Sequence, residues 1–220
     1  MSGEARAGTP LRLEALATHV GMSITPVREA LLGLAQEGWV ILEPNRGYRV
    51  AIFRRRDIAD LYELHAYLFG ELARRAARYI TPEALAELRA LDAEIRATPG
   101  SDTRRIEELN HSLHNGINAA ADAPRLSWFA KASRFLPGGF GWASVPGWLD
   151  HTRRGHHALL DALERRDEAA AAAAMQEQTR EAGKLLVEHL ENAGLFQNDS
   201  EPATRTRSRR ASSGAVRRTP

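Results

Sequence analysis

Residues 13–52 read LEALATHVGMSITPVREALLGLAQEGWVILEPNRGYRVAI, and the order of local signals in this stretch decides the fold. Leu13, Leu16 and Val20 recur at helical spacing and would form one apolar stripe, so the stretch opens with an amphipathic helix. Gly21 ends this helix, because glycine readily takes the left-handed conformation at a helix C-terminus. A tight turn must follow before the next apolar stripe begins.

A second helix is predicted to begin between Ser23 and Pro26. Ser23 and Thr25 can cap the unpaired N–H groups of a new helix. Proline fits only in the first turn, because the backbone N–H that it lacks would have no acceptor within the helix there. The core-facing stripe of this helix consists of Val27, Ala30, Leu31 and Leu34. The polar side chains near its start that point away from this stripe are Ser23, Thr25, Arg28 and Glu29.

Two short runs after Gly38 predict a β-hairpin. Residues 40–42 and 48–52 alternate β-branched and apolar side chains, and the segment from Pro44 to Gly47 between them has the composition of a turn. Helix, turn, helix and hairpin in this order make a winged helix-turn-helix, whose second helix enters the major groove of DNA.

Two strings in this stretch carry a resemblance to a known family. LATHVGMSITPVREALLGLAQEGWV (16–40) and NRGYRV (45–50) resemble the N-terminal signature of GntR-type bacterial transcription regulators. The resemblance implies DNA contacts from the second helix and the wing, and the matching residues are Ser23, Thr25, Arg28, Arg46 and Gly47.

The chain departs from this family at two DNA-facing positions. Family members usually carry arginine where this chain has Ile24, and often a basic residue near Glu14. Isoleucine cannot make a bidentate contact with guanine, and a carboxylate repels phosphate. We therefore expect an atypical operator, read mainly through Arg28, with Arg46 at the minor groove or the DNA backbone.

The N-terminus also departs from the family. Family members begin with an extra helix that leads into a segment similar to residues 2–11, where this chain starts. Either the start is set too late in the gene or the domain lacks its first helix. We favour the first alternative, because loss of the helix would expose the apolar stripe that it covers.

Length and composition exclude several classes of protein. The 220 residues suffice for one large or two small domains, each with a buried core. Cysteine is absent, so disulfides and thiolate–metal chemistry are excluded. No apolar run reaches the length of a membrane span, and the N-terminus lacks the apolar core of a signal peptide. We therefore expect a cytoplasmic protein with no membrane partner.

The net charge of +2 conceals a polarity along the chain. Residues 1–56 carry eight basic and five acidic side chains, residues 57–196 carry 16 and 21, and residues 197–220 carry six and two. Only the two ends are thus suited to a polyanion such as DNA. The basic tail has too few apolar residues to fold and is predicted to be disordered.

From residue 57 onward the pattern is helical. Asp57 is a candidate helix cap, and apolar stripes at helical spacing follow without a competing strand pattern. The expected helices cover 57 to about 76, 81–95, about 102–120, 151–165 and 167–191. The prediction is therefore mainly α, with an all-α bundle behind the winged domain. The predicted domains are a winged domain over 1–53, a helical effector-binding and dimerisation domain over 54–195, and a tail over 196–220.

Residues 124–150 differ from the rest of the bundle. The segment begins helical near Trp128 and then mixes glycine and proline with four large aromatic residues, Phe135, Phe140, Trp142 and Trp148. Such a segment fits either the wall or lid of a ligand cavity or ordinary packing of bulky side chains. The sequence leaves the two interpretations equal.

The helical region resembles the FCD effector domain of the FadR-type branch of the same family, in its shorter VanR-like form. The strings are DIADLYELHAYL (57–68), NHSLHNGINAAADAPRL (110–126) and GHHALLDALERRDEAAAAAAMQEQ (155–178), so the whole resemblance runs from residue 8 to about 193. Many such domains hold a divalent metal beside a carboxylate effector. The positions that match the metal ligands are Asn110, His114, His156 and Gln178.

The side-chain chemistry at these four positions limits how much of the family's metal site can be expected in this chain. His114 and His156 are suitable ligands for zinc or nickel, but the neutral amides of Asn110 and Gln178 are weak donors. One alternative is a degenerate zinc or nickel site on the two histidines. The other is a polar pocket in which imidazoles and amides bind an effector directly.

Two positions on the first bundle helix change the expected effector. His65 and Phe69 stand where the family carries arginine and glutamate, which disfavours a simple carboxylate and favours an apolar or aromatic molecule. The candidate effector-binding residues are therefore His65, Asn110, His114, His156 and Gln178. Three further histidines, expected to face solvent, are His111, His151 and His157.

Taken together, the sequence predicts a homodimeric regulator that places two winged domains on a pseudo-palindromic DNA operator. A small-molecule effector would control it, most simply as a repressor that the effector releases. A metal-dependent all-α enzyme could use His114 and His156, but no nucleophile–base pair accompanies them, so no catalytic residue is assigned. A protein-interaction adaptor with a degenerate winged helix is favoured by Ile24 and disfavoured by Arg28.

Overall fold

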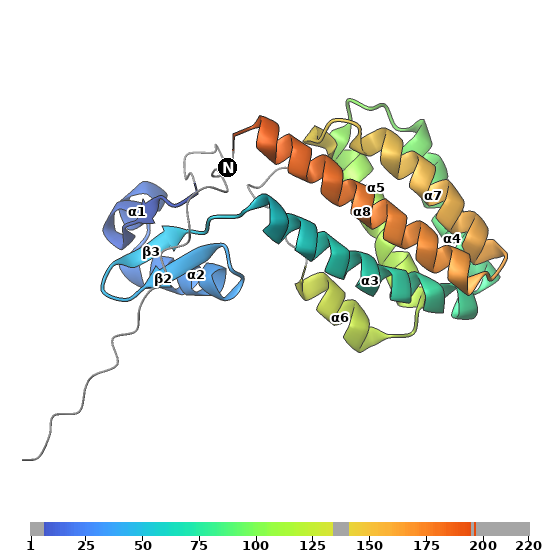
Figure 1. Cartoon of the computed structure of the whole chain (residues 1–220), viewed down its shortest axis with the longest axis horizontal. Coiled ribbons are helices and arrows are strands. Elements are labelled where there is room, and N and C mark those ends of the chain that lie inside the picture. Colours follow the sequence, from blue (N-terminus) through green and yellow to red (C-terminus); the bar gives the residue numbers. More distant parts are fainter. Residues whose placement is uncertain (1–6, 134–140, 195, 197–220) are drawn as a thin grey trace, which may run out of the picture.

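The computed structural model describes residues 7–133, 141–194 and 196, and a small winged unit and a helical bundle form within them (Figure 1). The two units lie beside each other and are joined by the extended segment between β3 (Gly47–Val50) and α3 (Arg55–Tyr79). The predicted basic tail, apart from Phe196, and the first six residues lie outside the described residues.

The small unit packs two helices on an antiparallel sheet. The helices are α1 (Leu13–Val20) and α2 (Ile24–Gln36), and the sheet has the order β1-β3-β2, with β1 at Pro10–Leu11 and β2 at Val40–Glu43. The hairpin register sets Leu42 opposite Tyr48. The buried core between helices and sheet consists of Ala17, Val27, Leu31, Val40 and Tyr48.

The predicted helix boundaries are confirmed in this unit, but the predicted side-chain cap is not. Gly21 ends α1 with a left-handed φ of 67°. Ser23 occupies the N-cap position of α2 without a side-chain capping hydrogen bond, and Thr25 lies inside the first turn of the helix. The strand β1 was not predicted, because two residues are too few to show an alternating pattern. Three residues of the predicted apolar stripes are exposed and not buried, namely Val20, Ala30 and Leu34. The short strands cover only part of each helix.

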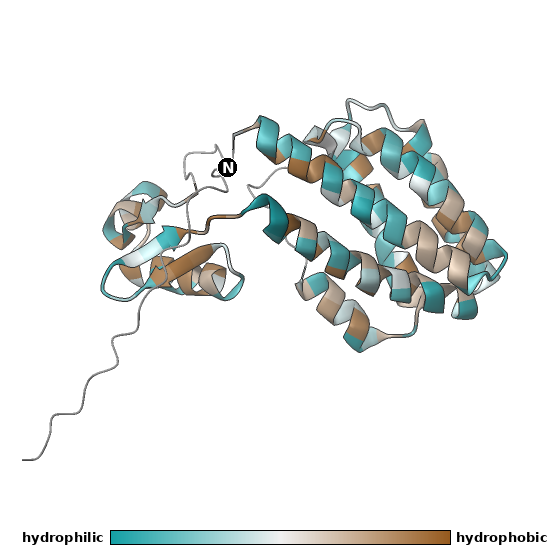
Figure 2. Ribbon diagram, in the orientation of Figure 1, coloured by the Kyte–Doolittle hydropathy of each residue, from teal (hydrophilic) through white to brown (hydrophobic). Residues whose placement is uncertain are grey.

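The bundle is all-α within the described residues, as predicted. It consists of α3, α4 (Pro82–Ala97), α5 (Thr103–Ala120), α6 (Pro124–Ala132), α7 (Trp148–Glu164) and α8 (Glu168–Asn192), with a 3-10 turn η2 (Trp142–Ser144). The helices α3 and α8, with 25 residues each, run side by side (Figure 1). Hydrophilic and hydrophobic residues alternate along them (Figure 2), as expected of amphipathic helices that share a core. No described helix is both long and apolar enough to cross a bilayer.

The start of α3 differs from the prediction. Asp57 lies in the first turn of the helix, and the N-cap is Arg54. The Asp57 carboxylate accepts the backbone N–H of Arg54 at 2.9 Å, so it satisfies an unpaired donor from inside the helix. The helix therefore begins two residues earlier than the sequence suggested.

Candidate functional site

The N-terminal end of α2 presents an exposed polar surface. Ser23, Thr25 and Arg28 are exposed, whereas Val27 between them is buried in the small core. The hydroxyls can donate to or accept from DNA, and the Arg28 guanidinium can reach a phosphate or a base edge. Ile24 lies among them with 39% of its surface exposed. The N-terminal end of α2 therefore presents polar groups and one exposed apolar side chain.

The tip of the wing is also exposed. Asn45 and Gly47 have left-handed φ angles of 62° and 84°, which turn the chain back between the two strands. Arg49, by contrast, is held by the carboxylate of Glu43 at 3.1 and 3.2 Å, and this hydrogen bond lowers the pKa of Glu43. Arg46 and the Gly47 backbone are exposed at the tip, as a DNA contact requires.

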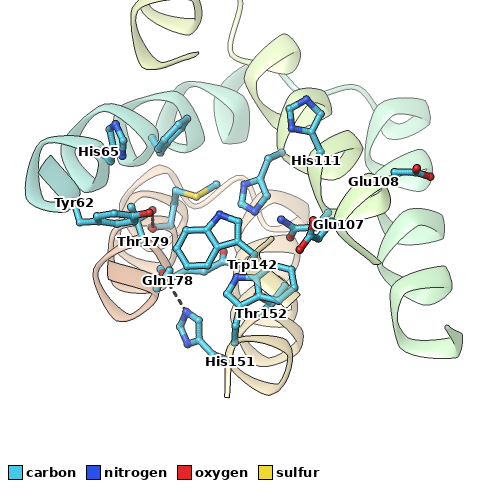
Figure 3. A pocket seen from close by; sticks show the side chains of 16 residues that line it. Tyr62, His65, Glu107, Glu108, His111, Trp142, His151, Thr152, Gln178 and Thr179 are labelled. Atoms are coloured by element: carbon cyan, nitrogen blue, oxygen red, sulfur yellow. Dashed lines mark hydrogen bonds between the residues drawn. The ribbon is translucent and has the colours of Figure 1, made fainter. Parts of the chain in front are cut away.

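A pocket of about 630 Å³ opens in the bundle between α3, α5, α7, α8 and η2 (Figure 3). This volume is typical of small-molecule sites. Four of the five predicted effector residues line it: His65, Asn110, His114 and Gln178. His65 is fixed there, because its Nε2–H donates to the backbone oxygen of Ser133 at 2.8 Å.

Aromatic rings form one wall of this pocket. Trp142 stacks on Trp148 and makes an edge contact with Tyr62, with ring centroids 6.0 Å apart in both pairs. Both interpretations of residues 124–150 hold in part, because Trp142 and Trp148 line the cavity while Trp148 also packs in the hydrophobic core, and Trp128 is exposed. Phe135 and Phe140 lie outside the described residues.

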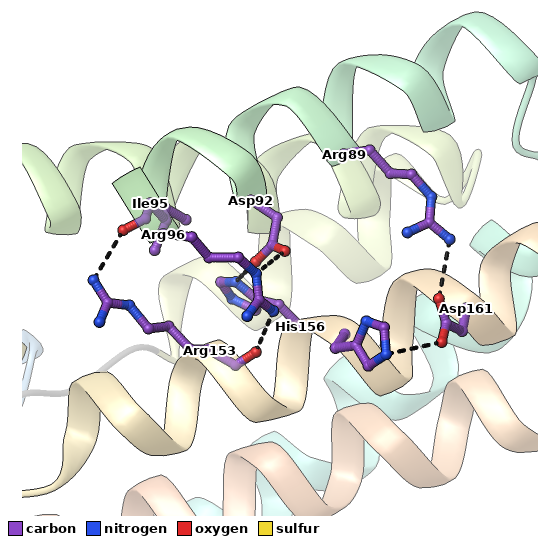
Figure 4. Close-up of polar contacts among 8 residues, drawn as sticks. Arg89, Asp92, Ile95, Arg96, Arg153, His156 and Asp161 are labelled. Atoms are coloured by element: carbon purple, nitrogen blue, oxygen red, sulfur yellow. Dashed lines mark hydrogen bonds and ion pairs between the residues drawn. The ribbon is translucent and has the colours of Figure 1, made fainter. Parts of the chain in front are cut away.

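The fifth predicted residue, His156, lies behind the pocket, where we expected it to line the cavity. Its side chain is completely buried, and its ring meets that of His114 edge-on with centroids 5.5 Å apart. Its Nδ1 lies 3.2 Å from Oδ1 of Asp92, a residue of α4 that the sequence did not single out (Figure 4). Its Nε2 is buried without a hydrogen-bond partner in the described part of the chain.

Asp92 is buried between two partners. Nε of Arg96 donates to Oδ2 at 2.7 Å, and His156 contacts Oδ1. Burial alone would raise the pKa of Asp92, but the hydrogen bonds from His156 and Arg96 together outweigh it and lower this pKa. The carboxylate therefore stays ionised and fixes the orientation of the His156 ring.

The expectation that three further histidines face solvent is wrong for His151. Its Nε2–H donates to the backbone oxygen of Gln178 at 2.9 Å, which ties α7 to α8 at the pocket wall. His111 is exposed but lies on the pocket lining, and His157 has a side chain that is 70% exposed. Packing of α7 on α8 turns His151 inward.

The residues that could hold a metal do not form a complete set. The described residues contain no group of three or more histidine, cysteine, aspartate or glutamate side chains placed to bind one ion. Two imidazoles and two amides therefore fit a tight zinc or nickel site poorly, and we assign no role to a metal.

Sequence reasoning missed several lining residues with useful chemistry, namely Tyr62, Glu107, Thr152 and Thr179. A signal was present for two of them. Glu107 lies one and two turns before Asn110 and His114, and Tyr62 lies one turn before His65, so each shares a helix face with a predicted residue. The two threonines are brought in by packing between helices, which no spacing along one helix reveals.

Comparison with known families gives a match in each unit. Residues 1–50 match the family described as bacterial regulatory proteins, gntR family, and residues 60–181 match the FCD domain. The transcriptional regulator McbR of Escherichia coli K12 is 28% identical over 170 residues, which cover 75% of this chain and 77% of McbR. The transcriptional repressor RspR of the same organism is 26% identical over 200 residues, which cover 87% and 86%.

Solved structures of bacterial regulators also resemble this chain over most of its length. The structure of E. coli McbR has a TM-score of 0.65 at 25% identity and covers 85% of this chain and 91% of its own. A GntR-family regulator from Pseudomonas syringae pv. tomato has a TM-score of 0.53 at 26% identity, with coverage of 86% and 82%.

Proposed function

The chain belongs to the gntR family of bacterial regulatory proteins, and from this premise we propose that it is a homodimeric repressor released by a small-molecule effector. It is a DNA-binding transcription regulator with an FCD domain and not an enzyme. The observation that carries the proposal is the pocket of about 630 Å³, which lies in the bundle and borders the helix that leads out of the wing.

The DNA side of the proposal rests on the exposed groups of α2 and the wing. Ser23, Thr25 and Arg28 fit a recognition helix in the major groove, and Arg46 with the Gly47 backbone fits the minor groove or a phosphate. The exposed Ile24 suits the methyl group of thymine and not the acceptors of guanine. We therefore propose an operator that lacks the guanine contact usual in this family.

A two-fold dimer is the simplest assembly for such an operator. Two identical winged units related by a two-fold axis match a pseudo-palindrome with half-site centres about 34 Å apart. The helix α3 supports coupling to the pocket, because it begins just after the wing and carries Tyr62, His65 and Phe69. A ligand that touches these side chains can favour one placement of α3, and it shifts the equilibrium by its difference in affinity for the two placements.

The DNA-binding half is tested by fluorescence anisotropy on a duplex from the region upstream of the gene. We expect a complex that prefers this duplex to a scrambled one and weakens with salt, and Arg28→Ala should weaken it by about 5- to 150-fold. The matched control is Arg154→Ala, which removes an exposed arginine of α7 and should leave affinity unchanged. Equal affinity for both duplexes, or equal loss in both variants, would contradict the proposal.

The effector half is tested with compounds that dissociate this complex. Thr179→Trp would fill the pocket from a partly buried position whose hydroxyl bonds only within α8 among the described residues. A true effector should release the wild type and fail on this variant, with circular dichroism confirming that the fold is intact. A compound that dissociates the DNA complex of both proteins equally does not act through the pocket. If every active compound behaved in this way, the proposed effector role of the pocket would be wrong.

A further inference from the structure

The outer face of α3 and α6, which points away from the bundle core, carries large apolar side chains. Leu64 and Tyr67 of α3 lie one turn apart, and Trp128 and Phe129 follow each other in α6. Their exposed fractions run from 43% to 67%. Three aromatic rings and a leucine at these exposures present roughly 400 Å² of apolar surface. This is about half of the roughly 800 Å² that each partner contributes to a standard protein interface, so the four side chains can form the apolar centre of one.

These side chains belong to one surface, because α6 packs on α3. The helix α6 lies beside α3 and runs in the opposite direction (Figure 1). The contact includes a hydrogen bond from His65 Nε2–H to the backbone oxygen of Ser133, the C-cap of α6, at 2.8 Å. Leu61, one turn before Leu64, lines the same small pocket as Lys131 of α6. The exposed stripe of α3 therefore borders α6, and we call the combined surface the α3–α6 face.

Opposite charges stand at the two ends of the α3–α6 face. Asp60 lies one turn before Leu64 on α3, and Arg125 lies one turn before Phe129 on α6. Both are exposed, and neither forms an ion pair within the described part of the chain. Asp60 precedes His65 by about 8 Å along α3, and Arg125 lies about 12 Å from the His65 contact in the other direction. The two charges are thus about 20 Å apart, with the apolar patch between them.

A two-fold axis through the middle of the patch brings these opposite ends together. In a two-fold interface the same surface serves both copies, so residue i meets residue j and j meets i. An axis between Tyr67 and Trp128 sets Asp60 of one copy against Arg125 of the partner subunit, and this pairing occurs twice. Complementary charges at the rim fix the register of such an interface.

From this complementarity we propose that the α3–α6 face is the dimer interface and that a second copy of the chain occupies it. Tyrosine and tryptophan, which contribute most of the binding energy in many interfaces, form its centre. The assignment rests on the proposed homodimer and adds the surface through which the two copies meet.

This interface adjoins the effector pocket through α3. Leu64 and Tyr67 alternate along this helix with Tyr62, His65 and Phe69, which line the pocket. A ligand that moves the lining side chains therefore acts on the helix that carries the interface and leads into the winged unit.

Analytical ultracentrifugation of the full chain measures the dissociation constant of the dimer. Tyr67→Glu places a charge in the middle of the apolar patch and should raise this constant at least about 30-fold. The matched control is Tyr79→Glu, the same change at an exposed tyrosine of α3 that lies about 18 Å further along the helix. It should change the constant by less than about three-fold. Circular dichroism checks that both variants keep the fold.

Chemical cross-linking tests the pairing itself, because the chain has no cysteine of its own. A short bismaleimide should join the double variant Asp60→Cys, Arg125→Cys into a covalent dimer, since its reach is well below the about 20 Å between the two positions within one chain. The control is the double variant Asp60→Cys, Arg154→Cys, whose second cysteine lies at an exposed position of α7. It should stay free of covalent dimer.

The outcomes separate this interface from the proposed homodimer. A dimer that Tyr67→Glu leaves intact, an equal loss in Tyr67→Glu and Tyr79→Glu, or cross-linking no faster than in the control would each show that the copies meet elsewhere. Any of these results overturns the α3–α6 assignment and leaves the homodimer standing. A wild type that stays monomeric in the ultracentrifuge overturns both, and the face then belongs to a different partner.

Discussion

Single side chains decide which buried groups of this protein keep their charge. Asp92 is only 7% exposed, yet it remains ionised because His156 and Arg96 both contact its carboxylate. The sequence predicted His156 from the family pattern but gave no reason to choose Asp92. Asp92 lies in α4 and His156 in α7, and a contact between two separate helices cannot be predicted from the spacing of residues along either helix.

Replacing Asp92 by asparagine is expected to lower the free energy of unfolding by about 1–3 kcal/mol at neutral pH, since charged hydrogen bonds are lost. The lowered pKa in the folded state means that this contribution is present above the ordinary pKa of 3.8 and is lost as the pH falls through the folded value. Urea unfolding from neutral pH down to about pH 3 should therefore show the two proteins converging in acid.

The matched control for Asp92→Asn is Asp60→Asn, the same change at an exposed position of α3. It should alter stability by less than about 0.5 kcal/mol. A loss at Asp92 that stays constant with pH would show that the carboxylate contributes through its shape and not through its charge.

At the scale of elements, the helices were predictable and the smallest strand was not. The start of α5 follows from Asp102, whose side chain accepts the backbone N–H of Arg105, and Ser23 marks the start of α2 by its position alone. The strand β1 depends on pairing with β3 across a long stretch of chain, and its two residues carry no pattern of their own. Tyr62 and Glu107 could have been found, since each shares a helix face with a predicted residue, whereas the packing of α7 on α8 brings in Thr152 and Thr179 without any signal in the spacing.

The close approach of α8 to α3 gives a prediction at a glycine. A Cβ atom on Gly183 would lie 2.6 Å from both Cβ and Cγ of Tyr62, so Gly183→Ala must push that ring or separate the helices. We expect a loss of about 1–3 kcal/mol from overpacking, larger than the gain of about 1 kcal/mol in helix propensity.

Gly33→Ala in α2 provides the opposite case, because a Cβ at Gly33 has no neighbour within 4 Å. This variant should be more stable by about 0.5–1 kcal/mol, and thermal unfolding of both variants measures the difference in sign. A stabilised Gly183→Ala would mean that α3 and α8 pack less tightly than the structure has them.

At the scale of the whole molecule, the pocket exists only because several helices converge. Asn110 and His114 come from α5 and Gln178 from α8, while His156 of α7 stands behind them. The family pattern identified these positions, but it could not tell which of them would face the cavity. That distinction depends on the three-dimensional packing of α7 against α4.

The same convergence predicts how metal binding could be gained. The wild type is expected to purify without stoichiometric zinc or nickel, because two of the four matched positions are amides. The double variant Asn110→Asp, Gln178→His should take up about one zinc per chain, measured by elemental analysis after dialysis. One equivalent of metal in the wild type, removed by His114→Ala, would show that two imidazoles and two amides suffice.

The 25-residue helix α3 runs from the wing past the pocket and is about 37 Å long. Under the proposed function it would therefore act as a lever arm. A tilt of about 5° about its far end would move its first turn by about 3 Å, close to the rise of one base pair at about 3.4 Å. In the proposed two-fold dimer the two displacements would add, and the half-site spacing would change by up to about two base pairs. A small shift of side chains in the pocket would thus become a difference in spacing that DNA binding can detect.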